Sequence, residues 1–436
     1  MLVLDINDAE ITLRRNGDEL YRQPGVADVA PKTTVLGHEA RARSRLHPQR
    51  SHNEFWQRLN ADPVTPHGRA VGNQADLVYL QLRELYAATE EKRPAVVVVA
   101  PSAVTNEQFA VLLGIAAEAG FDVHAIVDAS VAAASRETWD GSCAVVDVSL
   151  QRATVTQVER VDTDNGPVVR RAAVDEIPAA GFVPLLEGWI DVVADRFVDG
   201  TRFDPLRIAA TEQQVFDQLL TGIDTGAAEF AIEVDHHDVT RRVSVSRHAL
   251  AQKSTQRYEL FAKALGGAGT LAVSHRVLRL PGFAAFLQGA GHQLLPLTPD
   301  ALDGAVRDQA EHILPGPDEA GGTPGARLIT SLPARAGATS EPVPSRWPTH
   351  VLCNALAIPL AGDTSANEHP AFRPGSPNFR IRRGENGISV VPPPDAAVSL
   401  NGMPIDFEHP AGAGDTIDSG NLAFHLIAVV DGEEHG

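Results

Sequence analysis

Short apolar runs alternate with stretches of helical spacing along the first 160 residues. Residues 2–6 and 10–13 are strand-like runs separated by the polar pair Asn7-Asp8, which predicts a β-hairpin. After its proline, the run at 94–100 is wholly apolar, which is typical of a strand buried on both faces of a sheet. Strands and helices that alternate in this way predict an α/β domain with helices layered on a central sheet.

One helix carries a specific start signal. Thr105 is followed three positions later by Gln108, which is the spacing of a capping box. The amphipathic pattern runs over 105–119 and meets Gly120, so the sequence predicts a helix with both ends defined.

The same periodicities predict further elements up to residue 289, and no internal repeat stands out. Strands are expected at 123–127, 143–148, 153–161, 230–234, 239–245 and 273–280. Helices are expected at 34–60, 74–91, 128–136, 180–198, 211–222, 246–267 and 283–289.

The composition changes near residue 313. Residues 314–347 are rich in Pro, Gly, Ala, Ser and Thr, as in a linker, and 349–430 contain only short strand-like pieces. We therefore expect an α/β domain over 1–312, a Pro/Gly-rich linker over 313–347 and a small all-β domain over 348–436.

The charge balance limits the kinds of partner. The chain of 436 residues has a formal net charge of −19, which repels nucleic acid and anionic lipid. We expect no nucleic acid partner, whereas a basic protein partner is compatible with this charge. The alternative is that the charge serves solubility alone.

Cysteines and apolar segments indicate a compartment. Cys143 and Cys353 are the two cysteines and form no C-x-x-C pair, so neither a zinc site nor a redox motif is expected. The first residues lack the pattern of a secretory leader, and no stretch approaches the ~18 apolar residues of a spanning helix. We expect a cytoplasmic protein without membrane insertion.

Several segments in sequence order carry a family resemblance. Residues 95–109 give an apolar strand, a proline and a helix with an Asn-x-x-Gln-like start, and residues 126–134 read Ile-Val-Asp-Ala-Ser-Val-Ala-Ala-Ala. Residues 37–42 and 55–59 are two shorter segments that carry the same resemblance. Together these resemble the DnaK-type heat-shock chaperones and the wider actin-like ATPase superfamily over roughly residues 1–290. The resemblance implies a two-lobed α/β fold.

The resemblance also implies a nucleotide site. In this superfamily, two glycine-rich hairpins approach the phosphates and an acidic residue in each holds magnesium through water. The matching carboxylates are Asp5 and Asp147, and Asp128 matches a further acidic residue. Gln57 stands at the place of the family's catalytic lysine, and Gly282 is the one glycine left of the adenosine pair.

The residues around this implied site depart from the family's pattern. Asp8 replaces a small residue in the first hairpin and would repel phosphate, and Ser149, Leu150 and Gln151 stand where three glycines are expected. Each added Cβ crowds a backbone that must touch phosphate. We interpret the chain as a pseudo-ATPase with no expected cofactor, and with ATP and Mg²⁺ possible only if the site is retained. Alternatively, Asp5 and Asp147 simply cap turns at strand ends.

The C-terminal region has a resemblance of its own. Val-Ser-Leu-Asn-Gly-Met-Pro-Ile at 398–405, followed by Gly-Asp-Thr-Ile at 414–417, is similar to the second half of a forkhead-associated (FHA) domain. Asn401 and Gly402 match a phosphopeptide-binding or turn position in that family, and the turn role is favoured. Gly375-Ser376 is the nearest match to the family's Gly-Arg.

Other candidate signals favour ordinary structural roles. His236 and His237 are adjacent, so on a strand they would point to opposite faces, and we interpret them as a hairpin turn. Cys143 lies in an apolar strand and is not expected to be a nucleophile.

We consider three functions for this protein. The first is a non-catalytic interaction or assembly scaffold with the actin/DnaK-like fold. The second is a divergent nucleotide switch, and the third is a chaperone-like ATPase.

Overall fold

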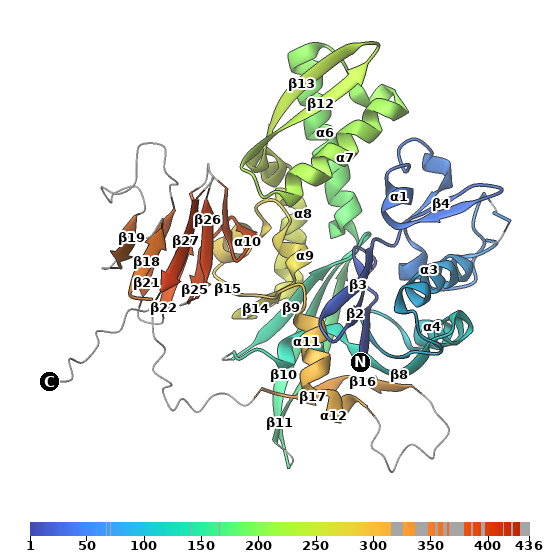
Figure 1. Cartoon of the computed structure of the whole chain (residues 1–436), viewed down its shortest axis with the longest axis horizontal. Coiled ribbons are helices and arrows are strands. Elements are labelled where there is room, and N and C mark those ends of the chain that lie inside the picture. Colours follow the sequence, from blue (N-terminus) through green and yellow to red (C-terminus); the bar gives the residue numbers. More distant parts are fainter. Residues whose placement is uncertain are drawn as a thin grey trace.

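The computed structural model describes most of the chain (Figure 1). Described are residues 1–314 except 67, 70, 140 and 165, residues 326–335, and residues 348–427 except 354–355, 361–363, 366–378, 385–386, 394–396, 413 and 420–421. These residues form a mixed α/β region with several sheets, followed by a region of antiparallel strands alone.

A six-stranded sheet organises the first α/β unit (residues 1–135). Its strand order is β16-β8-β7-β1-β2-β3, in which β16, β8, β7 and β1 are parallel and the β1-β2-β3 meander is antiparallel. The strands are β1 (Leu2–Asp5), β2 (Ile11–Arg15), β3 (Asp18–Gln23), β7 (Ala95–Ala100), β8 (Asp122–Asp128) and β16 (Arg327–Ile329).

A second six-stranded sheet organises the second α/β unit (residues 143–296). Its order is β15-β14-β9-β10-β11-β17, with β15, β14 and β9 parallel and the β9-β10-β11 meander antiparallel. The strands are β9 (Cys143–Val148), β10 (Ala153–Thr163), β11 (Gly166–Ile177), β14 (Thr270–Val273), β15 (Gln293–Pro296) and β17 (Ser331–Pro333).

Five strands of each sheet share one topology, and the sixth strands, β16 and β17, lie at non-equivalent edges. In each, an antiparallel meander of three strands is followed by two parallel strands added beside the first strand of the meander. β1 of one sheet therefore corresponds to β9 of the other. Asp5 ends β1, and Asp147 lies one residue before the end of β9, so the shared topology gives the two carboxylates equivalent positions.

Helices flank these sheets (Figure 1). They are α1 (Gly37–Arg41), α2 (Phe55–Arg58), α3 (Gln74–Thr89), α4 (Asn106–Ala119), α5 (Ala129–Ser135), α6 (Phe182–Thr201), α7 (Ala209–Asp224), α8 (Arg247–Leu265), α9 (His275–Leu278), α10 (Phe283–Gly289), α11 (Ala301–Asp308) and α12 (Ala310–Ile313), with 3-10 turns at Pro48–Arg50, Pro178–Ala180 and Pro205–Arg207. The capping box of Thr105 and Gln108 is present at the start of α4.

Two arms rise beside each other from the α/β units (Figure 1). The first contains α1 and a small sheet of β4 (Ala27–Val29), β5 (Thr34–Leu36) and β6 (Ser51–His52). The second contains α6, α7 and the hairpin of β12 (Glu229–His236) and β13 (Val239–Ser246). The side chains of Gln214 and Gln218 hydrogen-bond the backbone N–H and C=O groups of Asp235 and Glu233, so α7 covers this edge of β12.

The C-terminal region is an antiparallel sandwich. Its sheets have the orders β19-β18-β27-β26-β23-β24 and β20-β21-β22-β25. Side chains of both sheets share one core, in which Phe379 and Phe424 meet edge to face at 5.0 Å. The strands are β18 (His350–Cys353), β19 (Leu356–Pro359), β20 (Thr364–Ser365), β21 (Arg380–Gly384), β22 (Gly387–Val391), β23 (Val398–Leu400), β24 (Met403–Ile405), β25 (His409–Ala411), β26 (Thr416–Ser419) and β27 (Leu422–Ile427).

Three sequence expectations differ from the structure. The strand expected at 273–280 ends at Val273, because Ser274 caps α9 and accepts a hydrogen bond from the Val277 N–H. The single helix expected at 34–60 is broken into short elements. Within the expected linker 313–347, β16 and β17 extend the two α/β sheets.

Among the described residues, none of the helices combines the length and apolar character needed to cross a membrane.

Candidate functional site

The ends of β1 and β9 bring two carboxylates to one buried point between the α/β units. Asp5 and Asp147 are both largely shielded from solvent, with side-chain exposures of 9% and 15%. Two anions this close to each other in a shielded place require a cation or several hydrogen-bond donors.

Arg276 is the cation that lies between them. Its Nη1 is 2.9 Å from Asp5 Oδ2, its Nη2 is 2.9 Å from Asp147 Oδ2, and its Nε donates to Asp147 Oδ1 at 3.1 Å. Arg276 follows β14, which runs parallel to β9, so the carboxyl ends of the two strands place this arginine beside Asp147. One guanidinium thus joins the two halves of the molecule.

Arg276 and Asp147 stabilise each other's charge. Burial opposes the charge on Arg276, but Asp147 and Asp5 outweigh it and raise the pKa of the guanidinium. Burial likewise opposes the Asp147 anion, and Arg276 together with the Ser274 hydroxyl lowers the pKa of Asp147 despite it. Arg276 therefore stays a cation and Asp147 an anion at ordinary pH.

The first turn uses its polar groups within the protein. Asn7 Nδ2 donates to Asp147 Oδ2 at 3.0 Å and to the Val148 carbonyl at 3.1 Å, which links the two turns directly. The backbone N–H groups of Asn7 and Ala9 donate to Asp5 Oδ1 and Asn7 Oδ1. These donors are occupied and do not face an open anion site.

The second turn is occupied in the same way. The Leu150 N–H donates to Asp8 Oδ1 at 2.7 Å, and the Ser149 N–H donates to the Arg152 carbonyl at 2.8 Å. Burial raises the pKa of Asp8 to about 6, against the opposing effect of the Leu150 N–H. A buried carboxyl thus occupies the N–H group that a phosphate would need.

The N-terminus of α6 closes over the second turn. The Phe182 and Val183 N–H groups donate to the carbonyls of Ser149 and Leu150 at 2.9 and 2.7 Å. A Cβ on Gly181 would lie 2.1 Å from the Gln151 carbonyl carbon, so this close approach requires glycine. The positive end of the helix is therefore satisfied by the turn itself.

A histidine–carboxylate contact also joins the units beside Arg276, and burial lowers the pKa of this histidine, His275. His275 Nε2 lies 2.8 Å from Glu10 Oε1, and Arg22 also pairs with Glu10 at 2.5 Å. Although burial opposes the anion, His275 and Arg22 lower the pKa of Glu10.

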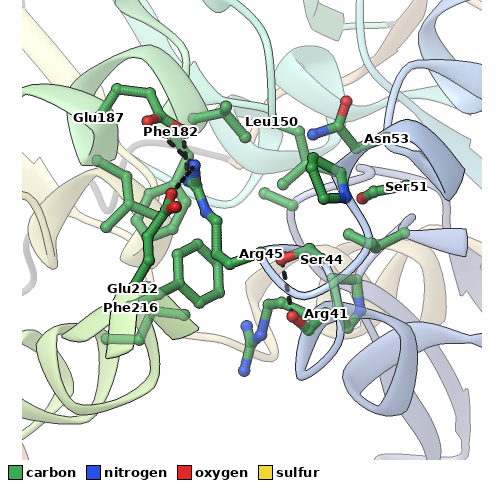
Figure 2. A pocket seen from close by; sticks show the side chains of 17 residues that line it. Arg41, Ser44, Arg45, Ser51, Asn53, Leu150, Phe182, Glu187, Glu212 and Phe216 are labelled. Atoms are coloured by element: carbon green, nitrogen blue, oxygen red, sulfur yellow. Dashed lines mark hydrogen bonds and ion pairs between the residues drawn. The ribbon is translucent and has the colours of Figure 1, made fainter. Parts of the chain in front are cut away.

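A cavity of about 250 Å³ lies above the two turns, between the arms (Figure 2). Leu150, Phe182 and Phe216 give it an apolar wall. Arg45 of the first arm reaches across it to Glu187 and Glu212 of the second, with 3.3 Å between Arg45 Nη1 and Glu212 Oε1.

A glutamine of the second arm also hydrogen-bonds to the first arm. Gln213 Oε1 accepts the Arg45 N–H at 2.8 Å, and its Nε2 donates to the Arg41 carbonyl at 3.2 Å. The arms are thus joined by an ion-pair cluster and two hydrogen bonds.

In the described part of the chain, no hydrogen bond or ion pair links the other residues of the implied nucleotide site to this cluster. Asp128 caps α5, accepts from the Ser102 hydroxyl at 2.7 Å and pairs with Arg171 at 2.8 Å. Gln57 lies in α2 (Phe55–Arg58), where its carbonyl accepts from Gln108 Nε2. Gly282 starts α10 at a φ of +72°.

In the C-terminal sandwich, Asn401 and Gly402 form the two-residue turn between β23 and β24, with φ values of 53° and 77°. Asn401 Nδ2 donates to Asp415 Oδ1, and its Oδ1 accepts the Thr416 N–H, so its side chain braces the turn. The FHA-like candidate Gly375-Ser376 lies outside the described residues.

The histidine pair lies between two strands. His236 ends β12, and His237 follows it in the turn before β13 at a φ of 49°. Within the described part of the chain, no group of three or more His, Cys, Asp or Glu residues could hold a metal ion.

Sequence reasoning missed Arg276, Asn7 and His275 as members of the buried cluster. The available signal was position: Val273 ends an apolar strand, and the polar residues Ser-His-Arg follow it directly. Ends of parallel strands at one sheet edge gather such residues. The strand wrongly expected over 273–280 hid this signal.

No protein-family profile matches the chain, and no curated protein matches it.

Proposed function

We propose that this protein is a non-catalytic, pseudo-ATPase member of the actin/DnaK-like fold that acts as an interaction or assembly scaffold. The observation that carries the proposal is Arg276, whose guanidinium lies between Asp5 and Asp147. These are the two carboxylates that the resemblance assigns to magnesium. An internal cation thus takes the role of the metal.

Magnesium would have to compete with Arg276 for both carboxylates. To bind Mg²⁺ at Asp5 and Asp147, the protein would have to expel a guanidinium that makes hydrogen bonds to both carboxylates. The positive charge of Arg276 would then be buried without a partner, which costs several kcal/mol. A phosphate would also have to displace Asp8 from the Leu150 N–H.

A scaffold needs a fixed shape, and the contacts between the two units supply one. Arg276 joins them at the base of the cleft, and Arg45 joins the arms above it. Further contacts between the units include Asn7 with Asp147, Asp8 with Leu150, Glu10 with His275 and Arg279, Asn53 with Gln151, and Asp128 with Arg171. Internal side chains therefore hold the cleft closed without a ligand.

The partner is inferred to be a protein. A net charge of −19 opposes nucleic acid and favours a basic protein surface. Under this proposal, binding of that partner does not depend on ATP.

The distance between the arms tests the proposal. Spin labels at Lys32→Cys and Asp195→Cys, two exposed positions, report this distance by double electron–electron resonance in a Cys353→Ser background. We expect one narrow distribution that Mg-ATP leaves unchanged. The double variant Arg45→Ala/Arg276→Ala removes both arginine contacts between the units and should broaden this distance distribution. A shift of the wild-type distribution on adding Mg-ATP contradicts the proposal and favours a nucleotide switch.

A further inference from the structure

The hairpin of β12 and β13 lies on the second arm (Figure 1). Its strands pair in one continuous register, and His237 and Asp238, both at positive φ, form the two-residue turn between them. In such a hairpin the two residues that flank the turn form a hydrogen-bonded pair. Hydrogen-bonded and outward-facing residues then alternate, so the register assigns the backbone groups that face away from the partner strand.

The outer edge of β12 is covered. By this register Glu233 and Asp235 point their backbone N–H and C=O groups outward, and the side chains of Gln218 and Gln214 from α7 hydrogen-bond these same groups. The agreement confirms which residues face outward. Because α7 covers this edge, no further strand can pair with β12.

The outer edge of β13 is open. Its outward residues are Thr240, Arg242 and Ser244, and all three are exposed. In the described part of the chain, no hydrogen bond is made to the N–H and C=O groups that these residues point outward. Backbone groups without a protein partner are rarely buried, so these groups face solvent. The strand also contains neither a proline nor a register shift, two features that commonly protect an edge.

We propose that an extended segment of a protein partner adds to β13 as a third strand of this sheet, with a carboxylate opposite Arg242. In strand addition, hydrogen bonds between main chains supply the affinity and alternate side chains supply the specificity. The segment runs antiparallel to β13, because antiparallel pairing is the more stable arrangement. Its backbone pairs with the outward groups of Thr240, Arg242 and Ser244.

The side chains on the open edge decide which segment fits. Arg242 pairs with Glu233, directly opposite it on β12, at 3.3 Å, and its side chain is 68% exposed. A carboxylate across from Arg242 on the added strand forms a favourable pair, whereas a cation there is repelled. A second copy of this chain fits less well. The antiparallel pairing of two β13 strands that uses all three outward residues of each brings the two Arg242 side chains opposite each other.

This inference rests on the proposed scaffold function, because it states how a protein partner attaches. The carboxylate concerns one strand of the partner and is compatible with a basic surface overall. The two proposals fail separately. Loss of the strand addition, with an arm distance that Mg-ATP leaves unchanged, overturns this inference alone, whereas a response of the arms to Mg-ATP overturns the pseudo-ATPase proposal.

A cyclic β-hairpin peptide tests the edge on the full-length protein. Its free strand reads Thr-Val-Glu-Val-Thr, which places Glu opposite Arg242 and a Thr opposite each of Thr240 and Ser244, and cyclisation pre-organises this strand. NMR titration and amide hydrogen exchange measure binding. We expect saturable binding that slows exchange at these three residues. The amides of Arg241 and Val243 already face β12 and should change less.

Control peptides separate the backbone from the charge. A peptide that is N-methylated at Glu lacks the central N–H donor and should not bind. A peptide with Lys in place of Glu should bind about tenfold more weakly. Arg242→Glu should reverse the preference between the Glu and Lys peptides. Arg170→Glu is an equal charge change at an exposed strand position elsewhere and should leave the preference unchanged.

A proline variant tests the edge itself. Ser244→Pro removes an outward N–H without removing a bond to β12, so it should abolish binding while the hairpin stays folded. Slow amide exchange at Val243 reports that the hairpin is intact. Absence of saturable binding by the wild type, equal binding of the N-methylated peptide, or full binding by Ser244→Pro overturns the proposal.

Discussion

At the scale of single residues, the centre of the molecule depends on one arginine. Arg276 has a side-chain exposure of 4% and forms ion pairs with Asp5 and Asp147. Arg276 is 271 residues from Asp5 and 129 residues from Asp147 in the chain, so no local sequence pattern could show that the three side chains meet. The sequence did predict that both aspartates lie at strand ends, because each closes a short apolar run.

Removing this arginine should be strongly destabilising. Arg276→Met leaves two buried carboxylates without a cation, and we expect the free energy of unfolding to fall by about 3–5 kcal/mol. Arg170→Met is the control. Arg170 pairs with Glu159, and both side chains are exposed, so its loss should cost about 1 kcal/mol or less. Urea unfolding measures both.

The same variant tests whether the guanidinium stands in for a metal. Mg²⁺ should raise the melting temperature of Arg276→Met and leave that of the wild type unchanged. A loss of stability below about 1 kcal/mol in Arg276→Met, matching the Arg170 control, contradicts the role given to this residue.

Asp8 gives a pH dependence of defined sign. Burial raises its carboxyl pKa from 3.8 to about 6, so the folded protein holds this proton more tightly than the unfolded chain does. The contribution of Asp8 to stability is therefore fully present below pH 4 and is lost as pH rises through 6.

Asp8→Asn should remove this dependence while keeping the acceptor for the Leu150 N–H. Between pH 4 and pH 7 the variant should gain about 3 kcal/mol relative to the wild type. Chemical unfolding of both proteins across this range measures the difference. Parallel stability curves for the two proteins would show that folding does not raise the pKa of Asp8 and would contradict this prediction.

At the scale of elements, the sequence predicted the features that depend on residues close together in the chain. The capping box of Thr105 and the hairpin around 236–239 were read from the sequence and are present. The segment after Val273 was read incorrectly, because Val277, Leu278 and Leu280 suit a strand as well as a helix. Ser274 caps α9 at its N-terminus and so favours the helix over the strand. Strands β16 and β17 were missed, since tertiary pairing makes them.

The turn between β23 and β24 carries a prediction. Asn401 has a φ of 53° and braces the turn through Thr416 and Asp415, so Asn401→Ala loses both the favoured backbone conformation and two hydrogen bonds. We expect a loss of about 1–2 kcal/mol and faster amide exchange at Thr416. Asn401→Gly keeps the backbone freedom and should lose less. Unchanged exchange at Thr416 in Asn401→Ala would argue against a bracing role.

At the scale of the whole molecule, the recurring sheet topology explains the site. Two units with one strand order place Asp5 and Asp147 at equivalent ends, facing each other. No internal repeat was visible in the sequence, because a shared topology needs only the same order of strands and not the same residues. The sequence therefore predicted an α/β fold with a β-region after it, and the structure added the repeated architecture and the contacts between its parts.

Calorimetric titration of the full-length protein with Mg-ATP and Mg-ADP tests the central claim most directly. A ligand at 100 times its dissociation constant would stabilise the fold by about 2.7 kcal/mol, so a thermal-shift measurement in parallel would detect the same binding. With Arg276 between Asp5 and Asp147, we predict no binding heat and no shift at millimolar nucleotide. Micromolar binding that disappears in Asp147→Ala would contradict the account and identify a working nucleotide site.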